Sequence, residues 1–329
     1  MKKFINQVEL VEDQMIAGMV KAYPQYVRKL DCGNVVVRTE KKEGKVALIS
    51  GGGSGHEPAH GGYVGTGMLD AAVAGAVFTS PTPDPIYEGI KAIATDKGVL
   101  MVIKNYTGDV MNFEMAGEMA QMDDIKVAQV VVNDDVAVDG SLYTVGRRGV
   151  AGTVFVHKIA GAKAEQGAEL EEVQRVAQKV IDNVRTMGVA IRPCTVPAAG
   201  KPGFELGEDE MEVGIGIHGE PGTHKEPLRP ADEIVDHILD KILSDIDYTG
   251  HEVAVMVNSS GATPLMELFI INNHVADVLA AKGIKVYRTF VGEYMTSLEM
   301  EGFSVSLLRL DDELKALLDA PADTIAFKA

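Results

Sequence analysis

The chain has 329 residues, of which 48 are acidic and 31 basic, giving a formal net charge of −17. A field of this sign repels a nucleic-acid backbone, so nonspecific nucleic-acid binding is not expected. Hydrophobic residues make up 46% of the chain, which is enough for a sizeable core, and the length predicts about two domains.

Neither export nor membrane insertion is predicted from the sequence. Glu9 and Glu12 interrupt the N-terminal segment before any apolar stretch long enough for a signal peptide. The densest apolar run, 99–103, has the length of a buried strand and not of a membrane span. Cys32 and Cys194 are too few for a disulfide scaffold. We therefore expect a cytoplasmic protein with no membrane partner.

The first half of the chain alternates apolar runs with segments of helical spacing. Residues 45–50, 98–103 and 125–132 predict buried strands, and 84–96 and 112–122 predict helices between them. This alternation predicts an α/β fold, in which ligands bind at the carboxyl ends of the strands.

The second half shows the same alternation of strands and helices after a long predicted helix. Apolar steps of three and four residues predict a helix over 169–187, with Gly188 as its C-cap. A Pro/Gly-rich stretch follows at 193–203. Beyond it we expect strands at 213–217, 252–257 and 284–290 and helices at 231–243 and 264–281.

We therefore expect two α/β domains, each a β-sheet covered by helices. The first domain is expected over residues 1–190 and the second over 191–329. The last 20 or so residues are expected to pack back onto the first domain.

Glycines dominate the segment after the first strong strand. Gly51, Gly52, Gly53 and Gly55 surround Ser54. They allow backbone N–H groups to close on a small polar ligand, or they only make a tight turn. Neither the dinucleotide-binding pattern nor the Walker A pattern is completed here.

The next residues match the letters of a zinc-protease motif, from His56 and Glu57 to His60. That motif needs both histidines on one face of an uninterrupted helix. Pro58 opposes such a helix in its interior and is better placed as the first residue of a helix. No zinc site is therefore expected at these residues.

A charged pair follows the strand at 98–103. Lys104 and Asp109 are separated by a short segment with Gly108, which permits a sharp turn. Asp109 could accept a proton from a bound hydroxyl, or it could cap the helix that follows. Ser80 ends another strand and is expected at the same edge of the sheet.

One histidine in the second half lies at a strand exit between glycines. His218 follows the apolar run 211–217 and precedes Gly219. Glycines clear space around the ring, so a ligand can approach it closely, although a single histidine can also be purely structural. A neutral imidazole nitrogen can add reversibly to a carbonyl carbon, which would select carbonyl compounds over polyols.

Two adjacent cations, Arg147 and Arg148, precede a predicted helix. They suit an anionic partner, but the alternative is ordinary ion pairing at the surface.

Four motifs in this order carry a resemblance to a known family. They are Gly51-Gly-Gly-Ser-Gly-His-Glu-Pro58, Lys104-Asn-Tyr-Thr-Gly-Asp109, Arg147-Arg-Gly-Val-Ala-Gly152 and Gly216-Ile-His-Gly-Glu-Pro-Gly222. With them the chain resembles the dihydroxyacetone kinases over essentially its whole length, and more narrowly the substrate-binding subunit of the phosphotransferase-system-dependent enzymes. Single-chain ATP-dependent members carry a further nucleotide-binding domain, for which we expect no room before Ala329.

The resemblance implies roles for particular residues. His218 would hold the substrate through its carbonyl carbon as a hemiaminal, and His56 and Asp109 would act as acid/base groups on the substrate hydroxyls. Gly53, Ser54, Gly55, His56, Lys104 and Asp109 would bind and orient the substrate. Covalent tethering suits a triose, which offers few contacts for noncovalent selection.

The resemblance also implies partners. ADP or ATP with magnesium would be held by a separate L subunit and rephosphorylated through a phosphoryl-carrier M subunit, and the substrate-binding chain would be a homodimer without a metal of its own. The alternative is a paralogue that binds dihydroxyacetone and acts as coactivator of a transcription factor, without kinase activity. Glu299 and Glu301 depart from the family's more usual Asp and Ala.

Overall fold

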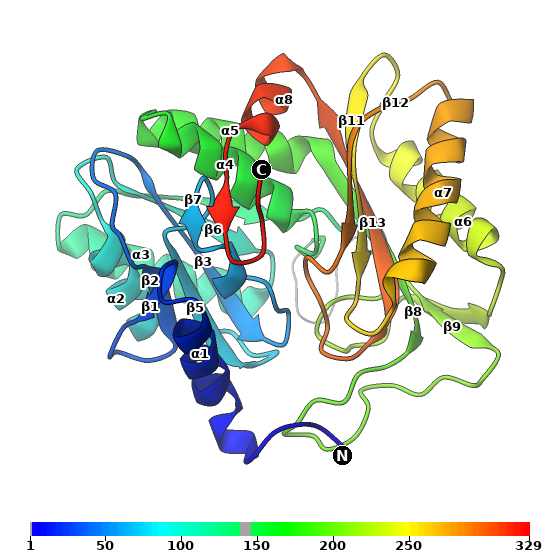
Figure 1. Cartoon of the computed structure of the whole chain (residues 1–329), viewed down its shortest axis with the longest axis horizontal. Coiled ribbons are helices and arrows are strands. Elements are labelled where there is room, and N and C mark those ends of the chain that lie inside the picture. The colour runs from blue at the N-terminus through cyan, green and yellow to red at the C-terminus, as the bar shows by residue number, and fades with distance from the viewer. Residues whose placement is uncertain (1, 139–145) are drawn as a thin grey trace.

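The computed structural model describes residues 2–138 and 146–329. Within these ranges the chain forms two six-stranded sheets with helices on their faces (Figure 1). The predicted α/β fold class is confirmed.

The first sheet has the strand order β1-β2-β5-β3-β6-β7. Strands β5, β3, β6 and β7 are parallel to one another, and β2 pairs antiparallel with β5. Helices α2 (Pro83–Ile93) and α3 (Thr107–Met122) pack on one face, and α1 (Val11–Ala22) packs on the other. The strands are β1 (Val27–Lys29), β2 (Val35–Arg38), β3 (Ala47–Ser54), β5 (Ala71–Val77), β6 (Val99–Lys104) and β7 (Val127–Val132).

The second sheet has the order β10-β9-β8-β13-β11-β12 and is antiparallel except for the β11–β12 pair. Helices α6 (Ala231–Asp245) and α7 (Leu265–Ala281) cover its outer face (Figure 1). The strands are β8 (Val184–Arg192), β9 (Glu210–Val213), β10 (His224–Pro227), β11 (Glu252–Ser259), β12 (Lys285–Gly292) and β13 (Glu301–Leu310).

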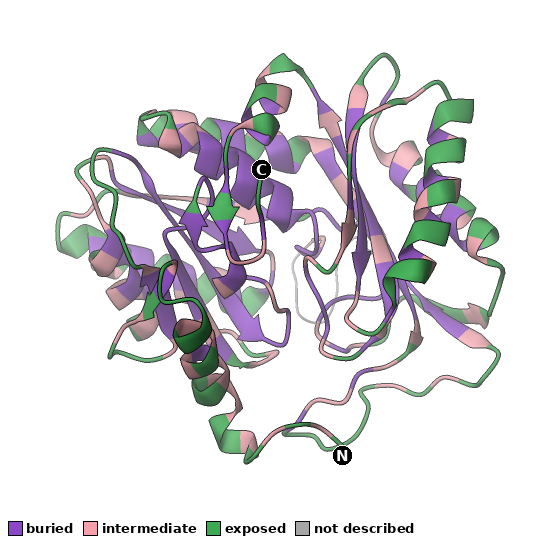
Figure 2. Cartoon of the chain, viewed as in Figure 1, coloured by how far each residue is buried: buried purple, intermediate pink, exposed green. Residues whose placement is uncertain are grey.

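A helical layer lies between the two sheets. It contains α4 (Thr153–Glu165) and α5 (Leu170–Asn183), and α8 (Asp312–Asp319) packs against α4. Most of α4 is buried on all sides (Figure 2). Phe155 of α4 meets Phe290 of β12 with ring centroids 5.7 Å apart. One apolar core therefore spans both sheets and the helices between them.

Short elements complete the chain. The C-terminal strand β14 pairs with β4, so the end of the chain returns to the side of the first sheet. These elements are η1 (Val8–Leu10), η2 (Gly61–Tyr63), β4 (Gly65–Thr66) and β14 (Asp323–Thr324). None of the helices in residues 2–138 and 146–329 combines the length and apolarity that crossing a bilayer requires.

Two expected elements end earlier than predicted. The helix predicted to reach residue 187 ends at Asn183, because residues 184–192 pair with β13 as strand β8. Gly188 therefore lies opposite Ser304 in a sheet and is not a helix cap. The strand predicted at 213–217 stops at Val213, because Gly214 adopts a φ of +72° and turns the chain. Strand β8 also spans the expected domain boundary after residue 190.

Candidate active site

The first sheet brings several predicted site residues to one edge. Strands β3, β5 and β6 are parallel neighbours, so their carboxyl ends lie together. His56 follows β3, Ser80 follows β5 and Lys104 ends β6. Asp109 lies inside the first turn of α3, where the N-cap position belongs to Tyr106. The alternative reading of Asp109 as the helix cap is therefore wrong.

The second sheet contributes His218 from the loop 214–222 after β9. Its ring contacts Tyr106, His56 and Phe78 edge-on, with centroids 4.3, 4.7 and 5.6 Å away. His56 in turn stacks on Phe78 at 5.3 Å. A cavity of about 530 Å³ opens beside these rings and is lined by Phe78, Ser80, Tyr106, His218 and other residues. The two sheets thus bring the predicted nucleophile and the predicted base together.

A buried arginine holds the loop that carries His218. The backbone N–H of His218 donates to Glu220 Oε2 at 2.9 Å, and Arg148 donates to the other carboxylate oxygen at 3.3 Å. Arg148 also donates to the carbonyl of Gly214 at 2.7 Å and pairs with Asp135 at 2.6 Å. Burial raises the pKa of Asp135 to about 6, although Arg148 opposes this. Arg148 is therefore an internal ion-pair residue, neither a surface charge nor a free site for an anion.

The protonation of His56 follows from its contacts. His56 Nδ1 lies 2.9 Å from the carbonyl oxygen of Thr296, so Nδ1 carries the proton and donates it. His56 Nε2 is buried and has no partner among the described residues. Burial and the Lys104 ammonium lower the pKa of His56 to about 3. The ring is thus neutral at neutral pH, with a free lone pair on Nε2.

His218 is neutral for the same physical reasons. Burial and the neighbouring His56, Lys104 and Arg148 hold its pKa well below the usual range. A protonated imidazole has no lone pair to attack with, so this setting keeps the ring nucleophilic.

Lys104 and Asp109 form a buried pair. Lys104 Nζ lies 3.7 Å from Asp109 Oδ2 and donates to the carbonyl of Gly51 at 3.2 Å. Burial raises the pKa of Asp109, which Lys104 and a hydrogen bond from Ser80 oppose. Burial also lowers the pKa of Lys104. Asp109 Oδ1 has no partner among the described residues, so it is available to a bound hydroxyl.

The glycines shape the site by leaving room. Residues 51–54 belong to strand β3 and not to a loop. Gly52 has a φ of +149°, and a Cβ atom there would collide with Lys104 Nζ. A Cβ on Gly53 would lie 2.7 Å from the backbone of Phe78, and Gly55, at φ +102°, lies against the ring of Phe78. Because these glycines have no side chain, there is space for the Lys104 ammonium and the Phe78 ring.

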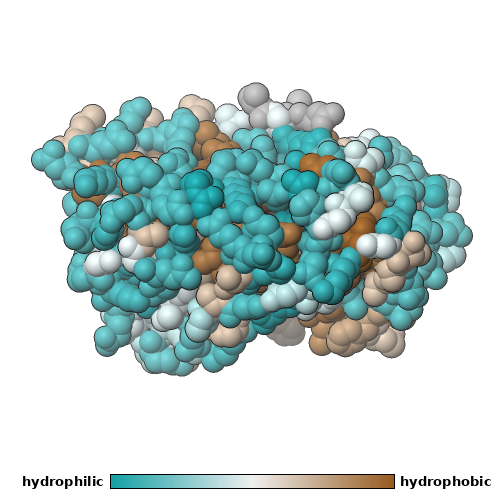
Figure 3. All heavy atoms as spheres, turned by 90° about the horizontal axis from the view of Figure 1, so that it is seen from above, coloured by the Kyte–Doolittle hydropathy of each residue, from teal (hydrophilic) through white to brown (hydrophobic). Residues whose placement is uncertain are grey.

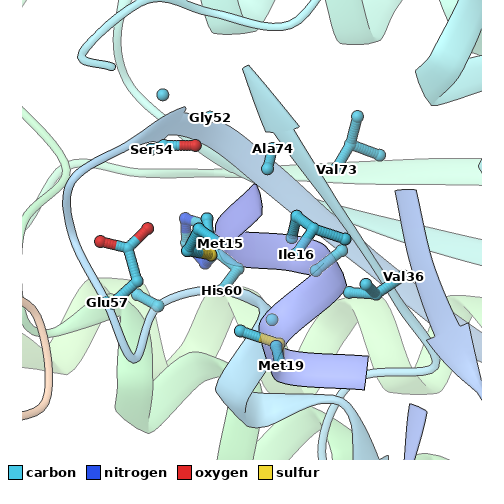
Figure 4. Close-up of a pocket in the computed structure, with 14 residues that line it drawn as sticks. Met15, Ile16, Met19, Val36, Gly52, Ser54, Glu57, His60, Val73 and Ala74 are labelled. Carbon is cyan, nitrogen blue, oxygen red and sulfur yellow. The ribbon is translucent and has the colours of Figure 1, made fainter. Parts of the chain in front are cut away.

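Ser54 lies on a different cavity from His218. The Ser54 hydroxyl donates to the carbonyl of Gly75 at 2.7 Å, so any contact of Ser54 with a ligand would be made by its backbone. With His60 it lines a cavity of about 20 Å³ on the side of β3 covered by α1 (Figure 4). Pro58 lies in a turn and begins no α-helix, because the nearest helical turn is η2 at Gly61–Tyr63.

Four residues of the site escape the sequence analysis. They are Phe78 and Tyr106, whose rings surround His218, and Thr296 and Glu220, which orient the two histidines. Burial keeps the pKa of Tyr106 well above its ordinary value, so its phenol is protonated, and its hydroxyl has no partner among the described residues. The only sequence signal for Tyr106 is its place between Lys104 and Asp109 at a strand exit.

The other residues noted in the sequence form ion pairs or hydrogen bonds within the protein. Arg147 pairs with Asp245 at 2.6 Å, and Glu301 pairs with Arg192 at 3.1 Å. Glu299 accepts the N–H of Thr195 at 3.1 Å. In the described part of the chain, no cluster of three or more His, Cys, Asp or Glu side chains is arranged to hold a metal ion.

Comparison with known proteins places this geometry in a family. The Dak1 domain model matches residues 17–326. The chain is 56% identical, over 99% of its length and 100% of the relative's, to the dihydroxyacetone-binding subunit DhaK of PTS-dependent dihydroxyacetone kinase 1 from Listeria innocua.

Solved structures agree with the sequence comparison. The dihydroxyacetone kinase of C. freundii has a TM-score of 0.93 at 35% identity, and the match covers 99% of this chain and 60% of that one. The dihydroxyacetone kinase operon co-activator Dha-DhaQ has a TM-score of 0.91 at 36% identity, with 98% of both chains covered. The chain therefore belongs to the Dak1 domain family, whose members include dihydroxyacetone kinases.

Proposed function

We propose that this chain is the dihydroxyacetone-binding subunit of a phosphotransferase-system-dependent dihydroxyacetone kinase. The observation that carries the proposal is a set of buried polar atoms without partners around one neutral histidine. His56 Nε2, Asp109 Oδ1 and the hydroxyl of Tyr106 are buried without hydrogen-bond partners among the described residues. Buried polar groups are nearly always paired, so these atoms are suited to a small polyhydroxylated ligand.

Covalent capture is the first proposed step. A ring nitrogen of neutral His218 attacks the carbonyl carbon of dihydroxyacetone, and the C–N bond forms as the C=O π bond opens onto oxygen. The proton on the other ring nitrogen leaves as this oxygen gains one, so the product is a neutral hemiaminal. The aromatic wall of Phe78 and Tyr106 keeps the ring in a low-dielectric setting, where it stays unprotonated.

His56 and Asp109 act as the acid/base groups on the substrate hydroxyls. His56 Nε2 offers a lone pair, because Thr296 fixes the proton on Nδ1. Asp109 Oδ1 can accept a hydroxyl proton, and the Lys104 ammonium supports its ionised form. Gly53, Ser54 and Gly55 are proposed to contact the substrate only through their backbone, because the Ser54 hydroxyl donates to the carbonyl of Gly75 on the other side of β3.

The phosphoryl donor is proposed to lie on a partner. ATP with magnesium would be held by a separate L subunit and regenerated by the phosphoryl-carrier M subunit, with no metal on this chain. We propose a cytoplasmic location, a compartment in which Cys32 and Cys194 would stay reduced.

The test is formation of dihydroxyacetone phosphate from purified components. Turnover is expected only when this chain, an ADP-loaded L subunit and its phosphoryl-donor proteins are all present. Product formed by this chain with ATP alone would contradict the two-subunit mechanism. Capture of dihydroxyacetone without turnover, with several L subunits tried, would favour the coactivator, for which the similarity to Dha-DhaQ is the supporting observation.

We also propose that the chain forms a homodimer through α7. Leu265, Met266, Phe269 and Ile270 are each at least half exposed on this helix. Figure 3 shows a hydrophobic area at the lower right, on the side of the helices that cover the second sheet. Contiguous exposed apolar side chains of this kind mark interfaces. Phe269→Lys should convert a dimeric mass in light scattering to a monomeric one, whereas Met122→Lys on α3, 82% exposed, should not.

A further inference from the structure

Two buried histidines have no role in the mechanism described above. His60 closes the zinc-protease letters in the sequence, and His157 lies on α4 in the layer between the sheets. They are 6% and 0% exposed. His60 Nδ1 lies 3.0 Å from His157 Nε2, and His60 Nε2 lies 3.0 Å from Lys104 Nζ. A hydrogen-bonded chain therefore runs from His157 on α4 through His60 to Lys104, whose ammonium forms an ion pair with Asp109 at 3.7 Å.

The proton positions in this hydrogen-bonded series of side chains follow from Lys104. An ammonium group only donates, so His60 Nε2 must accept from Lys104. His60 then carries its proton on Nδ1 and donates it to His157 Nε2. Burial and the Lys104 charge lower the pKa of both rings, that of His157 to about 3, so both are neutral. Ser50 Oγ, 3.5 Å from His60 Nδ1, donates to the carbonyl of Val102 and does not compete.

Each N–H group of the Lys104 ammonium faces an oxygen or nitrogen acceptor. The ammonium faces the carbonyl of Gly51 at 3.2 Å, His60 Nε2 at 3.0 Å and Asp109 Oδ2 at 3.7 Å. The bond to His60 is the shortest of the three. Without it, a buried N–H of a charged group would lose its partner, and the ammonium would be free to shift away from Asp109.

We propose that His60, itself held by His157, is a positioning residue that fixes the Lys104 ammonium beside Asp109 and so keeps that carboxylate ionised and oriented toward the substrate. The inference rests on the proposed function, because Asp109 acts as a base only there. His60 touches no substrate in this proposal and acts through Lys104.

The decisive comparison is between His60→Leu and His60→Gln. The amide oxygen of glutamine can take the place of Nε2 as acceptor for Lys104, whereas leucine cannot. In the complete kinase mixture, His60→Leu should lower kcat by about tenfold or more, as expected for a disturbed general base. His60→Gln should recover most of the rate. Capture of dihydroxyacetone by His218, followed by native mass spectrometry, should survive in both variants.

A control separates positioning from loss of stability. Lys158 follows His157 on α4 and is equally buried, but it donates to the carbonyl of Leu317 and not into this chain. Lys158→Met should lower thermal stability with little change in kcat. If kcat falls in Lys158→Met as far as in His60→Leu at equal stability, or if His60→Gln is as slow as His60→Leu, the proposal is wrong.

A second readout needs no turnover, and the His157 variants extend it to a position one step away from His60. Carbon NMR of the Asp109 carboxyl should report a higher pKa in His60→Leu and, to a lesser degree, in His157→Leu than in the wild type. His157→Gln should behave like the wild type, because it keeps an acceptor for His60. An unchanged Asp109 titration in the leucine variants would overturn the inference, even if the kinase function itself failed.

Discussion

At the scale of single residues, the site depends on histidines that burial keeps neutral. The pKa values of His56 and His218 are depressed chiefly because a charged ring is costly inside the protein. A depressed pKa means that the neutral form persists as the pH falls below the ordinary histidine value. Both rings are therefore in the neutral form that the proposed nucleophile and the proposed base require.

Covalent capture should accordingly be insensitive to mild acid. Between about pH 7.5 and pH 6.0, a histidine of ordinary pKa would lose roughly fourfold in its neutral fraction. Because the pKa of His218 lies well below 6.5, we expect constant capture over this range. Native mass spectrometry of the dihydroxyacetone adduct measures it, with His218→Ala as the blank. A fourfold decline would show that the ring titrates normally.

Gly52 should tolerate no side chain. A Cβ atom at this position would occupy the space of Lys104 Nζ, and the φ of +149° disfavours any L residue. Gly52→Ala should therefore displace the lysine, lower kcat in the kinase assay and reduce stability. Gly18 of α1 is the matched control, since nothing lies within 4 Å of a Cβ there. Gly18→Ala should leave kcat unchanged and raise stability by about 0.5–1 kcal/mol in urea unfolding.

At the scale of elements, the sequence predicts best where one face of a segment is buried. The helices expected at 84–96, 231–243 and 264–281 were found with small changes at their ends, because their apolar residues recur with the helical period. Helix α4 carries no such signal, since it is buried on nearly every side. The end of α5 was also missed, because pairing with β13 decides it.

The same limit applies to the site. His56, Lys104, Asp109 and His218 stand out in the sequence because each follows a strand or a glycine-rich segment. Thr296 acts through its backbone carbonyl, 240 residues away from His56 in the chain, and no local pattern marks it. Contacts that depend on how the two sheets meet cannot be predicted from sequence spacing.

The loop 214–222 should depend on Arg148. Arg148→Met would leave Asp135 and Glu220 without their cation, which for a buried pair costs about 3–5 kcal/mol. It would also free the carboxylate that holds the backbone N–H of His218. We expect lower stability in urea unfolding and weaker capture of dihydroxyacetone. Arg175→Met, at an exposed ion pair, should change neither measurably. Full capture by Arg148→Met would contradict the positioning role of the loop contacts.

At the scale of the whole molecule, the shared helical layer joins the sheets into one unit. The core that contains α4 and α5 includes strands of both sheets, so neither sheet keeps its full core when the other unfolds. We therefore expect a single calorimetric unfolding transition. Phe155→Ala should lower that transition, at a cost of about 3–5 kcal/mol, without splitting it. Two resolved transitions would show that the sheets unfold independently.

The two-sheet origin of the site has a consequence for how such proteins diverge. The proposed nucleophile comes from a loop of the second sheet, and the groups proposed for proton transfer come from strand ends of the first. After gene duplication, a copy could lose the chemistry of the first sheet while its second sheet still retained the triose. A sensor and a kinase can thus descend from one ancestor through changes confined to one half of the fold.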